Sequence, residues 1–274
     1  MVDTRVARRA WRRLEPVHGM IYFVPEAREL YAALGLHGRS GYFASRGAAF
    51  GAASAELVIA TFYNFNPDLV RRALPTAWEV TSPAEVLAAR LEAAGTALRR
   101  GGVDKAGELT ETLTLARRAA EAAAEHLHGR PLFAAHAALP WPGEPLLDLF
   151  HAQTLLREFR GDGHVASLVS EGLSPVEALV LHAASGEVPE VFLKASRGWP
   201  EEAWAEASDS LRARGLLADG LTEEGARLRG HIESRTDASA MPAYAALGEE
   251  GCSRLAELAR PFGRAVVEAG LLAF

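Results

Sequence analysis

Apolar residues recur along this chain at the spacing of helical faces. In residues 199–215, Trp204, Ala207 and Leu211 fall on one face of a helix, whereas the acidic residues of that segment fall on other faces. Ala, Leu, Glu and Arg dominate many stretches and β-branched residues are sparse, which favours helix over strand. The sequence therefore predicts a mainly α-helical protein.

An internal repeat organises this pattern. Residues 98–111 (LRRGGVDKAGELTE) align with residues 211–223 (LRARGLLADGLTE) at seven of thirteen paired positions, with one gap opposite Glu108. Further matches occur upstream in the same order, such as GYFAS (41–45) with GHVAS (163–167). The ordered series indicates a duplicated unit.

Each copy of the repeat is bounded in the same way. A long helical segment ends in Arg and Gly, where a cation suits the helix dipole and Gly suits the left-handed cap. A short turn with Gly107 or Gly220 follows, and Thr110 or Thr222 is then in position to be the N-cap of the next helix. Helix, tight turn and helix in this order are typical of a winged helix with a short β-wing.

Residues 198–237 (GWPEEAWAEASDSLRARGLLADGLTEEGARLRGHIESRTD) resemble the recognition helix, wing and following helix of MarR-type winged-helix proteins. The chain as a whole is similar to the SalK-like helix-turn-helix family, through the segments LREFRGDGHVASL, RGW and LTEEG. MarR-type proteins work as dimers. The resemblance therefore implies two fused winged-helix lobes that are arranged like a dimer within one chain.

The repeat and the resemblance together predict how the chain is divided. We expect an N-terminal basic helix or arm over residues 1–15, a first lobe over residues 16–136 and a second lobe over residues 137–274. A pseudo-twofold axis would relate the lobes of this mainly α, tandem winged-helix fold, and each lobe would have a short β-wing. The whole protein would be a monomer or a homodimer.

The charge of the predicted recognition helices argues against tight binding to DNA. The net charge is −6 and the pI about 5.9, whereas binding to phosphates favours basic surfaces. The second candidate helix, residues 199–215, has four acidic residues against two basic ones, and the acids precede the bases. The first, residues 82–100, is only slightly basic and includes Arg90. We expect weak or no binding to nucleic acid, with a MarR-like DNA-binding regulator as the alternative.

Residues 150–168 (FHAQTLLREFRGDGHVASL) hold the most polar part of the repeat. Two glycines flank Asp162, which predicts a turn that breaks the helix. The first copy has Tyr42 where this copy has His164, as expected if one lobe alone acquired a site. His164, Asp162 and Glu158 are candidate catalytic residues, because imidazole and carboxylate groups serve as acids and bases near neutral pH.

The side chains beside this turn are candidates for ligand binding. Arg157 and Arg160 would hold an anionic group, and His151 lies on the same helix stripe. The same segment also has a purely structural interpretation. In that case Asp162 is a helix cap, Glu158 is the ion-pair partner of a neighbouring arginine, and His151 is a buried core histidine.

Aromatic residues crowd into the front of the first lobe. Tyr22 and Tyr42 lie there, together with His18 and several phenylalanines. A core would use most of them, and the remainder could line an apolar pocket between the lobes, where ligand sites tend to form. MarR-type dimers hold small aromatic ligands at the equivalent junction, so the resemblance implies the same position. The ligand would be aromatic or anionic.

No motif identifies a reaction, a cofactor or a metal. The chain lacks HExxH, CxxC, P-loop and nucleophile-elbow patterns. Its one cysteine, Cys252, excludes an internal disulfide, and no run of about 18 apolar residues occurs. We expect a cytoplasmic protein that is not bound to a membrane. It would bind a small molecule between its lobes, with DNA binding lost or weakened, and the pocket could serve an enzyme.

Overall fold

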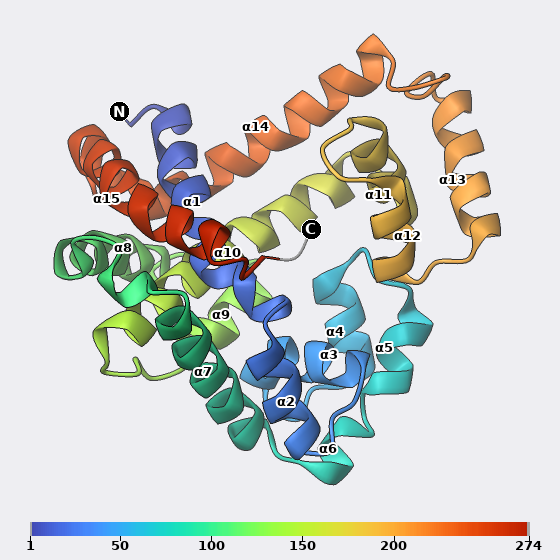
Figure 1. Ribbon diagram of the computed structural model, residues 1–274. Helices are drawn as coiled ribbons and strands as arrows, with labels where there is room; N and C mark the ends of the chain where they lie inside the picture. Colours follow the sequence, from blue (N-terminus) through green and yellow to red (C-terminus); the bar gives the residue numbers. More distant parts are fainter. Residues whose placement is uncertain (1, 273–274) are drawn as a thin grey trace.

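The computed structural model describes residues 2–272 and is built from helices (Figure 1). The α-helices are α1 (Thr4–Gly19), α2 (Pro25–Ala33), α3 (Arg39–Gly47), α4 (Ala55–Phe62), α5 (Pro67–Ala73), α6 (Ala77–Val80), α7 (Pro83–Arg100), α8 (Leu109–Ala123), α9 (Pro131–Ala137), α10 (Pro145–Ser170), α11 (Pro175–Ala184), α12 (Glu190–Arg197), α13 (Glu201–Ala213), α14 (Glu223–Ala245) and α15 (Gly248–Glu268). Short 3-10 helices occur at η1 (Met20–Tyr22), η2 (Ala48–Phe50) and η3 (Val103–Lys105). Over this described range, no helix has the length and apolarity needed to cross a membrane.

The mainly α class is confirmed, and the predicted β-wings are wrong. No strand or sheet forms within residues 2–272. At the second predicted wing, Leu217 and Leu221 form one isolated antiparallel bridge, and the first predicted wing contains η3 instead. The second wing has no room to lengthen. A tight turn closes it at one end, where Ala218 N–H donates to the Gly220 carbonyl at 2.8 Å, and at the other end α13 stops at Ala213 and α14 starts at Glu223. The two segments therefore differ in backbone, and the tandem winged-helix fold with pseudo-twofold lobes is incorrect.

Two apolar clusters hold the helices together. The larger lies among helices α1 to α10, the end of α14 and α15, and it takes residues from both ends of the chain. The smaller lies among α11, α12 and α13, with Leu168 of α10 and Ile232 of α14. The larger cluster thus draws on both predicted lobes. That residues 1–15, 16–136 and 137–274 are separate units stays a prediction.

Helix α10 is the centre of the structure, and it packs against α1, α7, α8, α9 and α14 (Figure 1). The turn that the sequence predicts around Asp162 is wrong, since α10 continues unbroken to Ser170. Gly163 lies where α10 meets α14, and a Cβ at this position would overlap the hydroxyl of Ser239. The glycine therefore permits a close helix crossing and does not end the helix.

Helices α11, α12 and α13 form a small unit at one side of the molecule (Figure 1). Ser174 is the N-cap of α11 and forms a capping box with Glu177, in which each side chain accepts a hydrogen bond from the other residue's backbone N–H. Helix α12 ends at Arg197, and the Gly198 that caps it has a φ of 70°, the left-handed conformation typical of the residue after a helix. After Trp199 and Pro200, α13 begins. Two helices thus meet at a tight turn and pack with α11.

The loop between α4 and α5 fixes this turn to the rest of the molecule. Asn66 donates from its side chain to the Gly198 carbonyl at 2.8 Å and from its backbone to the Arg197 carbonyl at 3.0 Å. The indole N–H of Trp199 donates to the Asn64 carbonyl at 3.0 Å. The α12–α13 turn is therefore tied to the larger part of the structure by both backbone and side-chain hydrogen bonds.

Candidate functional site

A cavity of about 670 Å³ lies between the N-terminal helices and α12. Its walls come from α1, η1, the start of α3, the loop before α5 and Arg157 of α10 on one side, and from α12 on the other. Its charged lining residues are Arg12, Glu15, Arg39, Arg157 and Arg197, and its aromatic ones are Trp11, Tyr22, Phe23, Tyr42, Phe65 and Phe192. We call it the arginine–aromatic cavity.

Tyr22 and Tyr42, which the sequence analysis proposed for a ligand pocket, both line this cavity. Their ring centres are 5.3 Å apart, and those of Tyr42 and Phe65 are 5.4 Å apart. His18 lies behind Tyr22, with Nε2 2.8 Å from the Tyr22 hydroxyl and Nδ1 2.9 Å from the Thr154 hydroxyl. Burial lowers the pKa of His18 well below its usual value. His18 is therefore a neutral group that orients Tyr22 from within the core.

The arginines of this cavity differ in their partners. Arg157 forms an ion pair with Glu15, and Arg39 donates to carbonyls at the C-terminal end of α12. Among residues 2–272, Arg12, Arg39 and Arg197 have no carboxylate within ion-pair distance. Three of the four arginines that line the cavity are thus left without an acidic partner.

Arg197, the last residue of α12, is the most informative of these three. Its guanidinium lies 4.7 Å above the ring of Phe65, and Nη1 donates to Ser196 Oγ at 2.8 Å. Its Nε is buried and has no hydrogen-bond partner in the described residues. Burial lowers the pKa of Arg197, and the positive charges of Arg46 and Arg39 lower it further. An anion in the cavity would offset this repulsion.

Glu158 lies behind the aromatic wall in a buried ion pair with Arg46. The two are 3.2 Å apart, and Glu158 is 3% exposed. Arg46 also donates to the Tyr42 hydroxyl at 3.1 Å and lies 4.1 Å above the ring of Phe62. Burial would raise the pKa of Glu158, but the charges of Arg46 and Arg157 outweigh it and lower the pKa to about 2. Glu158 is therefore a charged anchor that positions Tyr42 through Arg46.

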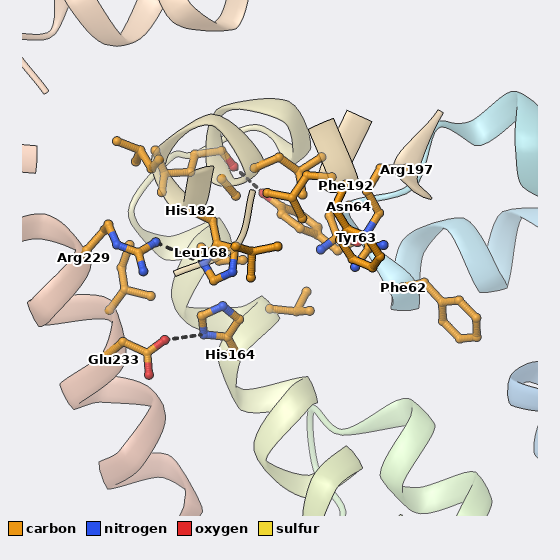
Figure 2. Close-up of a pocket in the computed structure, with 18 residues that line it drawn as sticks. Phe62, Tyr63, Asn64, His164, Leu168, His182, Phe192, Arg197, Arg229 and Glu233 are labelled. Atoms are coloured by element: carbon orange, nitrogen blue, oxygen red, sulfur yellow. Dashed lines mark hydrogen bonds and ion pairs between the residues drawn. The ribbon is translucent and has the colours of Figure 1, made fainter. Parts of the chain in front are cut away.

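A second cavity, of about 310 Å³, lies between α10, α11, α12 and α14 and contains His164 (Figure 2). We call it the histidine cavity. The charged and titratable residues near His164 are His182, Arg229 and Glu233. Phe192 and Arg197 line this cavity as well as the arginine–aromatic cavity. Helix α12 is therefore a wall that the two cavities share.

The three predicted catalytic residues have separate surroundings. Asp162 accepts a hydrogen bond from the backbone N–H of Phe133 at 2.9 Å, at the start of α9. Glu158 is in the core ion pair, and His164 faces α14, with Nδ1 3.0 Å from Thr236 Oγ1. The structure thus places all three on α10 without bringing their side chains to one reacting centre. Their catalytic role stays a prediction.

Arg160 and His151 line neither of these two cavities. Arg160 forms ion pairs with Glu233 at 2.8 Å and with Asp237 at 3.0 Å, which join α10 to α14. His151 packs edge-on against Trp141 with ring centres 4.9 Å apart, and burial lowers its pKa to about 4. Both side chains have structural partners, and their ligand-binding role stays a prediction.

Arg39, Arg197 and His182 line these cavities but were not predicted from the sequence. Arg197 stands in the RGW segment that carries part of the resemblance, yet no local pattern marks it as a cavity residue. Arg39 reaches the carbonyl of Ser196, which is 157 positions further along the chain. Contacts at such separation have no signal in a single sequence, although the RGW segment was a reason to consider Arg197.

The surface of α13 is acidic. Its acidic residues Glu201, Glu202, Glu206 and Asp209 are all exposed. Arg212 is paired with Asp209 at 2.8 Å, and Arg214 with Glu177 at 3.3 Å. In α7, the other candidate for a recognition helix, Arg90 is 3% exposed and lies in the core, so it adds no positive charge to the surface. The cations that DNA binding would need are therefore paired or buried in these helices.

Comparison with known proteins gives one positive result. The chain matches the model of a family described as the helix-turn-helix family over residues 7–273. No curated protein matches it, and no solved structure matches it. The order of α12, the turn at Gly198 and α13 agrees with the family description. The match does not distinguish MarR-type or SalK-like proteins, so the finer resemblance stays a prediction.

Asp162→Asn tests the environment of one predicted catalytic residue. Burial raises the pKa of Asp162 from 3.8 to about 7. Between these values the folded protein binds more protons than the unfolded chain, so the ionising aspartate reduces stability as the pH rises. Asparagine keeps an oxygen for the Phe133 N–H and removes the charge. We expect the variant to be more stable than the wild type by about 2–4 kcal/mol near pH ~8 and nearly equal near pH ~4.

Urea unfolding at the two pH values measures this difference. Asp219→Asn, at an exposed position between α13 and α14, is the matched control and should leave the stability unchanged at both. A stability difference for Asp162→Asn that is the same at both pH values would show that the carboxyl titrates normally.

Proposed function

This chain belongs to the helix-turn-helix family, and we propose that the protein binds an aromatic molecule with an anionic group. The proposed site is the arginine–aromatic cavity. One observation carries the proposal: Arg12, Arg39 and Arg197 line this cavity without a carboxylate partner among residues 2–272. The family match does not identify a ligand.

An anionic ligand would balance a local excess of positive charge. The protein as a whole carries a net charge of −6, yet this cavity is lined by four arginines and one glutamate. Arg197 is only partly exposed, whereas Arg12 and Arg39 are exposed. Water screens a partly buried charge less than an exposed one, so the attraction for an anion should be strongest beside Arg197. A carboxylate near Arg197 would accept charge-assisted hydrogen bonds from its guanidinium.

The aromatic walls would hold the ring of the ligand. The Tyr22 hydroxyl is bound to His18 and the Tyr42 hydroxyl to Arg46, so both residues offer mainly their rings to the cavity. Aromatic contacts contribute about 0.5–1.5 kcal/mol beyond the burial of apolar area. The cavity volume of about 670 Å³ suits a small molecule of one or two rings.

DNA binding is the second candidate function, as in a MarR-like regulator. Family membership and the order of α12, turn and α13 favour it, because the second helix of such a pair enters the major groove. The acidic surface of α13 opposes it, because carboxylates repel phosphates. We therefore propose that ligand binding is the main function and that DNA binding is weak.

Arg197→Gln should weaken the binding of naphthoate, a probe with two fused rings and one carboxylate. A hydrogen bond to a charged group contributes about 1.5–3 kcal/mol, so we expect Kd to rise roughly 10- to 100-fold. Isothermal titration calorimetry measures this change. Arg264→Gln, at an exposed position of α15, is the matched control and should bind as the wild type does.

Naphthamide has nearly the same shape as naphthoate but no charge. It should bind the wild type less tightly than naphthoate and lose little affinity in Arg197→Gln. Equal affinity for the two probes, or an unchanged Kd for naphthoate in Arg197→Gln, would rule out an anion site at Arg197.

The wild type should form no specific DNA complex at ~0.15 M salt. Replacing Glu202 and Glu206 by Lys removes two repulsive charges and adds two attractive ones, so non-specific affinity should rise and become more dependent on salt. Fluorescence anisotropy with the DNA upstream of its own gene measures both. Tight, sequence-selective binding by the wild type would instead establish the regulator.

A further inference from the structure

His164 in the histidine cavity has its hydrogen fixed on Nδ1. Thr236 donates its hydroxyl hydrogen to the Ile232 carbonyl at 2.8 Å, so its oxygen is an acceptor toward His164 Nδ1 at 3.0 Å. Burial lowers the pKa of His164, which keeps the ring neutral. A neutral imidazole with its hydrogen on Nδ1 has an acceptor at Nε2. His164 Nε2 is therefore a hydrogen-bond acceptor.

His182 has the opposite arrangement. His182 Nδ1 lies 3.4 Å from Arg229 Nη1 and 3.9 Å from a carboxylate oxygen of Glu187. The guanidinium is the nearer group and only donates, so Nδ1 accepts its hydrogen bond. Burial, and then the charge of Arg229, lower the pKa of His182, so this ring is neutral too. Its hydrogen is on Nε2, which is therefore a donor.

The two rings face one another across the histidine cavity. Figure 2 shows His164 reaching in from α10 and His182 from α11, with Glu233 and Arg229 on the outer side of each ring. Neither Nε2 has a hydrogen-bond partner within the described part of the chain. One acceptor and one donor thus point into the same space with nothing of the protein bound to them.

The rest of the cavity offers no net charge beside these rings. Glu233 is paired with Arg160 at 2.8 Å and with Arg8 at 3.0 Å, and Arg229 with Glu187 at 3.3 Å. Arg197 also lines this cavity, but its guanidinium lies against Phe65 in the neighbouring one. The remaining lining is largely apolar and includes Val165, Leu168, Leu173, Leu179, Leu181 and Ile232.

We propose that the histidine cavity is a second binding site, for a small neutral molecule with a primary carboxamide on an apolar body. The amide N–H would donate to His164 Nε2, and the amide carbonyl would accept from His182 Nε2–H. A carboxylate has no hydrogen for His164, and an ammonium has no acceptor for His182. This site is independent of the anionic ligand proposed for the arginine–aromatic cavity.

The test uses hexanamide, with hexanoate and hexylamine as controls of the same chain length. NMR of protein labelled with nitrogen-15 in histidine reports which ring nitrogen carries the hydrogen, and His→Phe variants assign the signals. Before addition, His164 should be protonated on Nδ1 and His182 on Nε2. Hexanamide should shift the Nε2 signals of both residues, whereas hexanoate and hexylamine should shift neither.

His182→Phe should weaken hexanamide binding roughly tenfold or more, because it leaves the amide carbonyl without a donor. His128→Phe, at an exposed position outside this cavity, is the matched control. The wild-type tautomers provide a second readout that does not depend on how a variant folds.

The opposite tautomer on either histidine, equal binding of hexanoate, or unchanged Nε2 signals with hexanamide would overturn the proposal. Naphthoate binding should be unaffected by His182→Phe. A failure at the histidine cavity is therefore distinguishable from a failure at the arginine–aromatic cavity.

Discussion

The buried ion pair between Arg46 of α3 and Glu158 of α10 is the interaction on which the rest of the arrangement depends. Two charges taken out of water are tolerated only when they are closely paired, and removing one partner of such a pair typically costs about 3–5 kcal/mol. Here Arg46 Nη2 lies 3.2 Å from Glu158 Oε2, and this contact holds α3 against the central helix α10. Arg46 then holds the Tyr42 hydroxyl and covers the ring of Phe62. The aromatic wall of the larger cavity therefore depends on a charge in the core.

Helix α12 connects this wall to the small three-helix unit. Phe192 and Arg197 contribute to both cavities, and α12 is also the first helix of the α12–turn–α13 pair. Arg39 binds the carbonyls at the end of α12, and Asn66 holds the turn that follows. A ligand bound to Arg197 would therefore contact the first helix of the pair directly, without any relay through the core. In this arrangement, the two cavities and the helix pair share one short helix.

Local patterns in the sequence predicted the helical class and some of the residues that line the arginine–aromatic cavity, whereas contacts between residues distant in sequence determine the rest. The crowding of aromatic residues pointed to Tyr22 and Tyr42, and the polar segment over residues 150–168 pointed to Arg157; all three line one cavity. The prediction of a turn around Asp162 was wrong because a glycine that allows another helix to cross closely cannot be told, in the sequence, from a glycine that ends a helix. The prediction of β-wings was wrong because a short segment with glycine is compatible with either a β-hairpin or a 3-10 turn. No local sequence pattern marked Arg197 as a cavity residue. Its importance comes from the ring of Phe65 beside it and from the lack of a carboxylate partner among residues 2–272, and both depend on the fold.

The central claim is that the arginine–aromatic cavity holds an anionic aromatic molecule, and native mass spectrometry of the purified protein tests it most directly. The intact wild-type protein should carry one additional mass, and denaturation should release an aromatic acid. Arg197→Gln, purified in the same way, should carry much less of it. A wild-type protein that carries a neutral or cationic compound, or a variant that retains the acid in full, would contradict the account.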